Sequence, residues 1–455
     1  MTAPERSHRR ALPEAPARRG WCPGLARPMP TGDGLLARLH PPLGILTRDQ
    51  ARAVAEGARR FGNGHLDITA RANLQIRGVT EASSAPLADL LDDVGLGDLR
   101  ADGGPQRLTL TSPLAGHDPA ETIDVPALAR AVESAGLGIA GLPAKTLVVV
   151  EGRPGVTVPE ADLRVSVWES GGVAIALGSG LEDRDLVFCS AAEAPILVAA
   201  LLDAFARTGR RRMRDLSDDE RTALAAALHA TGLARLPAPV QAFERVGAPH
   251  GVVPFAPAAG LRVEARFQVL TLDAPFGRCT ADALERVVSA AEAVEAADIR
   301  LSPTRGFVLL APAGAPAAAV LAERAADFIV TSDDPRRRID ACTGAPGCTS
   351  GSTPTLGDAA RLAAVFSPLA AGGFSAHVSG CVKGCARPGP ADVTLVGRDG
   401  IYGAIIGGAP GDEPTINLPI EAVLERLGRA KTVGLAAAFA PETARTECGG
   451  TRRPA

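Results

Sequence analysis

Two stretches of the chain, residues 42–75 and 275–308, share one pattern of hydrophobic and polar positions without a gap. In each stretch the apolar residues recur with the spacing i, i+3, i+4, i+7, which is typical of an amphipathic helix. The stripes are Ala51, Val54, Ala55 and Ala58 in the first copy and Leu284, Val287, Val288 and Ala291 in the second. Thr47 and Thr280 stand where each helix would begin, and Gln50 completes a capping box in the first copy alone. The pattern predicts an internal duplication.

Strands are expected on both sides of each helix. Residues 261–271 alternate polar and apolar with period two, which predicts one strand, and residues 66–69 and 299–302 predict strands after the helices. Further helices are expected near 85–95 and 315–328. Each copy is therefore β-α-β with a second helix, and two copies related by a pseudo-twofold axis would form an α+β platform.

The two stretches are separated by 233 positions in the sequence, and the same offset continues beyond them. It places Pro113 on Pro346, Thr109 on Cys342 and Ala115 on Cys348, so one half carries thiols and the other does not. A stretch rich in Pro and Gly at 234–260 is expected to be the linker between the halves.

Composition narrows the class of protein. A length of 455 residues predicts two to four domains, and the formal net charge of −3 argues against nucleic acid as a partner. No run approaches the roughly 18 apolar residues of a membrane span. The first twenty residues hold five arginines and are followed by no apolar run, so we expect a disordered tail rather than a secretory signal, with a transit peptide as the alternative. A cytoplasmic, reducing location is expected.

Four of the eight cysteines lie close together in the sequence. Cys342 and Cys348 are separated by five residues, and Cys381 and Cys385 by three. Four thiolates complete a 4Fe–4S cubane, and the nearby glycines let a backbone fold tightly round it. A four-cysteine zinc site is the alternative, although its usual spacing of two to four residues fits the first pair less well. Of the other four cysteines, only Cys22, between Trp21 and Pro23, has a distinctive context.

This cysteine pattern closely resembles the cluster motif of the sirohaem nitrite and sulfite reductases. Residues 69–77, with the pattern T-x-R-x-N-x-Q-x-R, the segment that Arg107 opens, and residues 142–145, with the sequence LPAK, resemble further motifs of that superfamily. The resemblance spans roughly residues 30–440. It implies an internally duplicated α+β fold in which two ferredoxin-like half-domains alternate with two sulfite-reductase-type domains.

The resemblance and the duplication together predict the domain boundaries. We expect a tail with a family-specific block at 1–30, a ferredoxin-like half-domain at 31–100, a sulfite-reductase-type domain without a cluster at 101–233, a linker with the second half-domain at 234–332, and the cluster-bearing domain at 333–455.

The N-terminal block favours one branch of the superfamily. Residues 20–36 and 39–42 resemble the precorrin-3B synthases of aerobic cobalamin biosynthesis. That resemblance implies an iron–sulfur monooxygenase that hydroxylates precorrin-3A at C20 and closes a γ-lactone. It also implies a mononuclear non-haem iron and NADH as the electron source. The reductases carry two lysines as K-F-K, whereas Lys145 is here followed by Thr146 and Leu147, which fits the loss of small-anion chemistry.

The tetrapyrrole substrate is fringed with carboxylates, and arginine binds a carboxylate through two parallel hydrogen bonds. By motif match we expect the substrate to be bound by Arg71, Arg77, Arg107 and Lys145, with Asn73 and Gln75 as additional hydrogen-bonding residues. No histidine pairs with a nearby carboxylate in sequence, so no ligand of the mononuclear iron is assigned. Residues 171–180 are glycine-rich but lack the dinucleotide spacing, so a separate electron-donating reductase is expected as a partner.

Two other functions remain open at this point. A sirohaem-dependent nitrite or sulfite reductase would carry an intensely absorbing macrocycle. A tetrapyrrole carrier or an electron-transfer module would bind without turnover.

Overall fold

The computed structural model describes residues 21–153, 156–157, 160–168, 172–178, 184–233 and 253–441. The chain divides into two compact units, with the boundary between Ser332 and Asp333. The predicted tail before residue 21 and most of the linker at 234–260 lie outside the described residues, whereas residues 172–178 of the glycine-rich segment at 171–180 are described. The four-part division into domains remains a prediction. Within the described residues, no helix is both long and apolar enough to cross a membrane.

The larger unit contains the predicted duplication. Helix α1 (Arg48–Phe61) begins at the Thr47 cap, whose hydroxyl accepts from the backbone N–H of Gln50 at 3.1 Å. Helix α6 (Ala281–Ala293) begins at Thr280 in the same way. Before each helix lies one turn in which a non-glycine residue has a positive φ, 55° at Leu43 and 57° at Phe276. These residues are related by the predicted offset, so the copies share backbone geometry as well as pattern.

The two copies exchange one strand each. The first sheet has the order β1-β2-β5-β4-β15 and the second the order β13-β14-β17-β16-β3. Strand β15 (Arg278–Thr280) of the second copy pairs with β4 of the first, and β3 (Ile45–Leu46) of the first copy pairs with β16 of the second. One hydrophobic core runs through both copies. The remaining elements are β1 (Met29–Thr31), β2 (Gly34–Leu39), β4 (His65–Ile68), β5 (Leu74–Val79), α2 (Glu81–Asp92), β14 (Phe267–Asp273), β16 (Ile299–Ser302), β17 (Gly306–Pro312) and α7 (Ala317–Ala322).

The prediction of a single strand at 261–271 is wrong. This segment forms a hairpin of β13 (Gly260–Val263) and β14, which pair antiparallel with Gly260 opposite Thr271. At the turn, the backbone N–H of Glu264 donates to the carbonyl of Phe267 at 2.9 Å. Residues 264–266 include no Gly, Pro, Asn or Asp, so the alternation continued through the turn without a turn signal.

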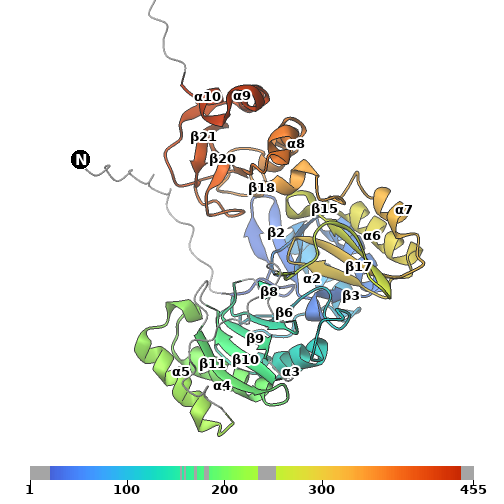
Figure 1. Cartoon of the computed structure of the whole chain (residues 1–455), viewed down its shortest axis with the longest axis vertical. Helices are drawn as coiled ribbons and strands as arrows, with labels where there is room; N and C mark the ends of the chain where they lie inside the picture. The colour runs from blue at the N-terminus through green and yellow to red at the C-terminus, as the bar shows by residue number, and fades with distance from the viewer. Residues whose placement is uncertain are drawn as a thin grey trace, which may run out of the picture. The chain divides into compact units, whose positions relative to one another are not determined.

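A second sheet region of the larger unit follows the first copy. Its strand order is β11-β10-β9-β7-β6, and it has its own apolar core with α3 and α4 (Figure 1). The elements are β6 (Thr109–Thr111), α3 (Val125–Leu137), β7 (Val148–Glu151), β8 (Val156–Thr157), β9 (Leu163–Val167), β10 (Gly172–Leu177), β11 (Arg184–Ser190), α4 (Ala194–Arg207) and α5 (Asp218–Ala230). The short strand β12 (Val253–Pro254) pairs with β8.

The smaller unit repeats this topology. Its sheet has the order β18-β19-β20-β21-β22, with two parallel pairings followed by two antiparallel pairings, as in β6-β7-β9-β10-β11. The elements are β18 (Ile339–Ala341), α8 (Thr355–Ala371), β19 (Ala376–Ser379), β20 (Ala391–Arg398), β21 (Ile401–Gly408), β22 (Ile416–Leu418), α9 (Ile420–Val433) and α10 (Leu435–Ala438). The predicted α+β class and duplication are confirmed.

The strand register corrects one sequence alignment. Thr111 pairs with Val150 at the end of β6 and β7, and Ala341 pairs with Val378 at the end of β18 and β19. The next residue, Ser112, is therefore the counterpart of Cys342, rather than Thr109 as the constant offset predicted. The constant offset fails because the segment between the second copy and its sheet is three residues shorter than in the first half.

Candidate active site

The four motif cysteines lie together in the smaller unit. Cys342 follows β18 directly, and Cys381 comes two residues after β19. Because these strands are parallel neighbours, their carboxyl ends bring both cysteine loops to one edge of the sheet. The backbone N–H of Gly380 donates to Cys342 Sγ at 3.1 Å, and Lys383 Nζ donates to Ser350 Oγ at 3.1 Å, so both loops are joined directly.

Glycine is required in these loops. Gly344 has a φ of 61°, and a Cβ there would lie 2.3 Å from Thr355 Oγ1. A Cβ on Gly380 would lie 3.1 Å from the Cα atoms of both Gly344 and Gly351. Three backbone segments therefore meet at a distance that excludes side chains, which is the close packing that the sequence predicted.

The thiols influence one another electrostatically. Burial raises the pKa of Cys385, and Cys381, Cys342 and Cys348 raise it further. Burial likewise raises the pKa of Cys381, with contributions from Cys342 and Cys348. Cysteines bind metal as thiolates, and the positive charge of bound iron would favour that form at Cys381 and Cys385. The donor set thus fits a 4Fe–4S cluster, and the assignment remains a prediction.

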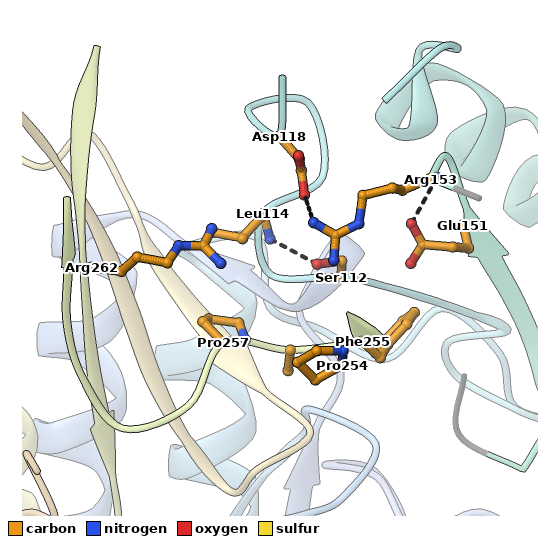
Figure 2. A pocket seen from close by; sticks show the side chains of 10 residues that line it. Ser112, Leu114, Asp118, Glu151, Arg153, Pro254, Phe255, Pro257 and Arg262 are labelled. Carbon is orange, nitrogen blue, oxygen red and sulfur yellow. Dashed lines mark hydrogen bonds and ion pairs between the residues drawn. The ribbon is translucent and has the colours of Figure 1, made fainter. Parts of the chain in front are cut away.

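The counterpart of this cysteine edge in the larger unit is a small pocket without cysteine (Figure 2). It encloses about 100 Å³. By the same register, Ser112 corresponds to Cys342 and Arg153 corresponds to Cys381. Arg153 donates to Asp118 at 2.7 Å, and its backbone N–H donates to Glu151 at 3.0 Å. An ion pair has therefore replaced thiols at the equivalent edge.

Two carboxyl groups beside this pocket predict a pH dependence of stability. Burial raises the pKa of Glu151 from 4.5 to about 7, and burial does the same for Glu121. The folded form thus holds more protons on these two groups than the unfolded form does between these values. Their contribution to stability is therefore fully present below pH 4.5 and is lost as pH rises through about 7.

A Glu151→Gln variant should be more stable than the wild type at pH 8, by of the order of 1–3 kcal/mol, with little difference at pH 5. Urea unfolding at both pH values measures this. Glu160→Gln, at an exposed ion pair, is the control. An equal effect at both pH values would contradict the burial argument.

A cluster of cations occupies another part of the larger unit. Arg107 is buried, and its guanidinium donates to the carbonyls of Pro41 (2.9 Å), Ala72 (3.0 Å) and Arg71. Burial lowers its pKa to about 10. Arg107 therefore fixes the backbone on which Arg71 stands. Its predicted contact with substrate is not tested by this arrangement.

Arg71 and Lys145 lie in a positive field. Burial lowers the pKa of Lys145, and the guanidiniums of Arg71, Arg212 and Arg38 lower it further. Burial and then Arg212 lower the pKa of Arg71. The guanidinium of Arg71 makes no hydrogen bond or ion pair with any other described residue.

Asp162 is the nearby carboxylate, and it is already engaged. It accepts from Arg212 Nε at 3.0 Å and from the backbone N–H groups of Leu147 and Met213. The cation cluster of Arg38, Arg71, Lys145 and Arg212 thus carries excess positive charge, which suits a ligand with several carboxylates. Sequence reasoning missed Arg38 and Arg212, and the position of Arg38, two residues before His40 in the family block, was the available signal.

The other predicted residues have different surroundings. Arg77 is 3% exposed and donates to Asp33 (2.6 and 3.0 Å) and to Asp67 (3.1 Å), a geometry that favours a structural role over substrate binding. With its amide oxygen turned toward Arg38, Gln75 accepts from that guanidinium at 2.8 and 2.5 Å. Asn73 is 7% exposed, and its Oδ1 has no hydrogen-bond partner in the described structure.

The missing second lysine has a structural explanation. Leu147 is 3% exposed and is part of the core, and its backbone N–H donates to Asp162 at 3.0 Å. A lysine at this position would place a charge in the core, so the second cation of the reductase motif cannot be recovered by a small shift.

Comparison with known proteins identifies the family. The chain is 35% identical to a precorrin-3B synthase of Sinorhizobium sp., over 96% of this chain and 94% of that protein. The chain belongs to the precorrin-3B synthase family. The precorrin-3B synthases are in turn related to the nitrite reductases: a ferredoxin–nitrite reductase of Synechococcus elongatus is 26% identical over 83% of this chain and 78% of its own length.

The superfamily is supported by two further findings. The family model of the nitrite/sulfite reductase ferredoxin-like half domain matches residues 27–94 of the sequence. The structure of the Mycobacterium tuberculosis NirA protein matches with a TM-score of 0.66 and 19% identity, covering 87% of this chain and 80% of that one. The predicted membership and the duplicated fold are thereby confirmed. Its relatives are redox enzymes, so this precorrin-3B synthase family member is an oxidoreductase.

Proposed function

We propose that the chain converts precorrin-3A to precorrin-3B in cobalamin biosynthesis. The observation that carries this proposal is the relative named precorrin-3B synthase, which aligns along nearly the whole chain. The reaction is a monooxygenation: one atom of dioxygen enters C20 as a hydroxyl, the other leaves as water, and NADH supplies the two electrons through a separate reductase. The ring A acetate closes the γ-lactone by attack on the adjacent carbon. The chain acts in the cytoplasm.

The proposed cofactors are a 4Fe–4S cluster on Cys342, Cys348, Cys381 and Cys385 and a mononuclear non-haem iron. A cluster in the cysteine loops supplies one-electron transfer. The chain's own part is to bind and orient the macrocycle. Arg71 and Lys145, with Arg38 and Arg212, would bind its carboxylates, and Arg107 would hold Arg71 in place. Fixing the ring A acetate makes lactone closure intramolecular, which lowers its barrier.

Replacing Arg71 with Ala should weaken precorrin-3A binding by about 10–100-fold, because hydrogen bonds to charged groups contribute about 1.5–3 kcal/mol. Fold stability should change little, since the guanidinium has no partner within the described structure. Titration of anaerobic protein with precorrin-3A, followed by absorbance, measures the affinity. Arg71→Lys keeps the positive charge but cannot form two parallel hydrogen bonds to a carboxylate. Its affinity for precorrin-3A should lie between those of the wild type and Arg71→Ala. Unchanged affinity in Arg71→Ala would show that Arg71 does not bind the substrate.

The visible spectrum tests the alternative of a sirohaem-dependent nitrite or sulfite reductase. The proposal predicts the broad absorption of an iron–sulfur protein without macrocycle bands in anaerobically purified protein. Stoichiometric sirohaem bands, together with nitrite or sulfite turnover, would show that the chain is a nitrite or sulfite reductase. The buried Leu147 at the position of the second lysine counts against that outcome.

A further inference from the structure

The pocket at the counterpart of the cysteine edge is built from segments that are far apart in the sequence (Figure 2). One wall is the loop after β6, where the guanidinium of the buried Arg300 donates to the carbonyls of Pro113 and Ala115, at 3.0 Å each. Another wall is the end of β7 with Glu151, and a third is the segment 254–257. The loop is therefore held in place by the protein itself.

Two guanidinium groups line this pocket. Arg153 Nη1 donates to Asp118 at 2.7 Å, and Arg262 Nε lies 2.8 Å from Glu264 Oε1. Each ion pair engages one nitrogen, and the other two side-chain nitrogens of each arginine make no hydrogen bond with a described residue. Both groups point toward the same part of the pocket in Figure 2. Because arginine stays charged and offers parallel N–H donors in one plane, the two groups suit an oxyanion.

Another side of the pocket is apolar. It is lined by Pro254, Phe255 and Pro257, and Phe255 is 7% exposed. The cavity of about 100 Å³ is larger than the ~30 Å³ that one water molecule occupies in the liquid. A ligand of several heavy atoms, with one charged end and one apolar end, therefore fits this lining better than a bare inorganic ion.

Glu151 makes the charge of the pocket depend on pH. It is 4% exposed, one carboxyl oxygen accepts from the backbone N–H of Arg153 at 3.0 Å, and the other makes no hydrogen bond with a described residue. Burial raises its pKa to about 7, Arg153 opposes this rise, and Asp118 adds to it. The other charged groups nearby are Glu121 and, across the pocket, Arg262 with its ion-pair partner. The protonated carboxyl can donate to an anion, whereas the carboxylate would repel it.

We propose that this pocket binds a small organic monocarboxylate. Arg153 and Arg262 bind its carboxylate, and the proline and phenylalanine side chains contact its short apolar tail. The Oγ atom of Ser112 already accepts from the N–H of Leu114 at 3.2 Å, so its own proton is free for the ligand. A dianion such as phosphate is disfavoured, because the ion-pair partners already offset the charge of both arginines. This site is separate from the proposed tetrapyrrole site and adds a second ligand to the protein.

Binding of propionate to the full chain, with its cluster oxidised, tests the site. Saturation-transfer difference NMR follows the methyl group of the ligand, and titration gives the Kd. We expect a Kd of about 1 mM or lower at pH 6. The Kd should be about tenfold higher at pH 8, because a carboxyl group with a pKa of about 7 is then only about one-tenth protonated. Glu151→Gln keeps a neutral donor, so its Kd should be the same at both pH values.

Arg262→Ala should weaken propionate binding by about 10–100-fold, because hydrogen bonds to charged groups are the stronger ones. The matched control is Arg286→Ala. The Arg286 side chain is 44% exposed in an ion pair with Asp327, and that of Arg262 is 43% exposed, so this variant should bind propionate like the wild type.

Three results would overturn the proposal: no saturable propionate binding in the wild type, an equal Kd in Arg262→Ala, or tighter binding of inorganic phosphate than of propionate. A wild-type Kd that does not change between pH 6 and pH 8 would also contradict it, and this comparison does not depend on the folding of any variant. Neither precorrin-3A nor oxygen takes part in the test, so a failure of the proposed function would not affect its result.

Discussion

Replacing Cys342 with Ser should remove the cluster while leaving the larger unit folded. Cys342 stands at the end of β18, where its sulfur accepts from the N–H of Gly380 at 3.1 Å, and a cubane with three thiolates is labile. Iron and acid-labile sulfide, measured after anaerobic purification, should both fall by the content of one cluster.

The control for this prediction is Cys279→Ala. Cys279 is buried in the hydrophobic core of the larger unit, so its thiol is not available to the cluster. That variant should keep the full sulfide content. If Cys342→Ser kept it as well, the four-cysteine assignment would be wrong.

Replacing Arg77 with Ala should destabilise the larger unit by about 3–5 kcal/mol, the usual cost of removing one partner from a buried ion pair. The side chains of Asp33 and Asp67 are only 15% and 17% exposed, so solvent screens the pairs little. Asp67 also accepts from Arg278 at 2.6 and 3.0 Å, so this network connects the two copies of the duplication.

Urea unfolding measures the loss, and a double-mutant cycle with Asp33→Asn isolates the pair. The double variant should be more stable than the sum of the single effects predicts, because each single variant leaves one charge without its partner. Additive effects, or a loss below about 1 kcal/mol as at exposed ion pairs, would contradict the structural role of Arg77.

The helices and the duplication were predictable because local rules and global packing agree there. The cap at Thr47 and the stripe around Val54 occur twice, and both copies fold into a helix that begins at its threonine. Two features were not predictable. The hairpin after Val263 turns without a turn residue, and the exchange of β3 and β15 between the copies is a long-range pairing that no local pattern records.

Part of the candidate site was likewise predictable from the sequence, and part was not. The cysteines were found from spacing, since loops after neighbouring parallel strands bring such residues together. The roles of the cations could not be separated by motif: Arg71 and Arg77 belong to one segment, yet Arg77 faces Asp33 and Asp67 while Arg71 lies among other cations. Carboxylate partners distant in sequence decide which arginine remains available for a ligand. Cys22 and His40, 18 residues apart in the sequence, likewise come together only in the fold, with Sγ and Nε2 3.5 Å apart.

The most direct test of the central claim is turnover of precorrin-3A by the cluster-containing chain under ¹⁸O₂, with NADH and an electron-donating reductase. The account predicts a product whose mass increases by one ¹⁸O atom, carried as the C20 hydroxyl of a γ-lactone, with the second labelled atom recovered in water. A product without label, or substrate returned unchanged while the same protein reduces nitrite or sulfite, would contradict it.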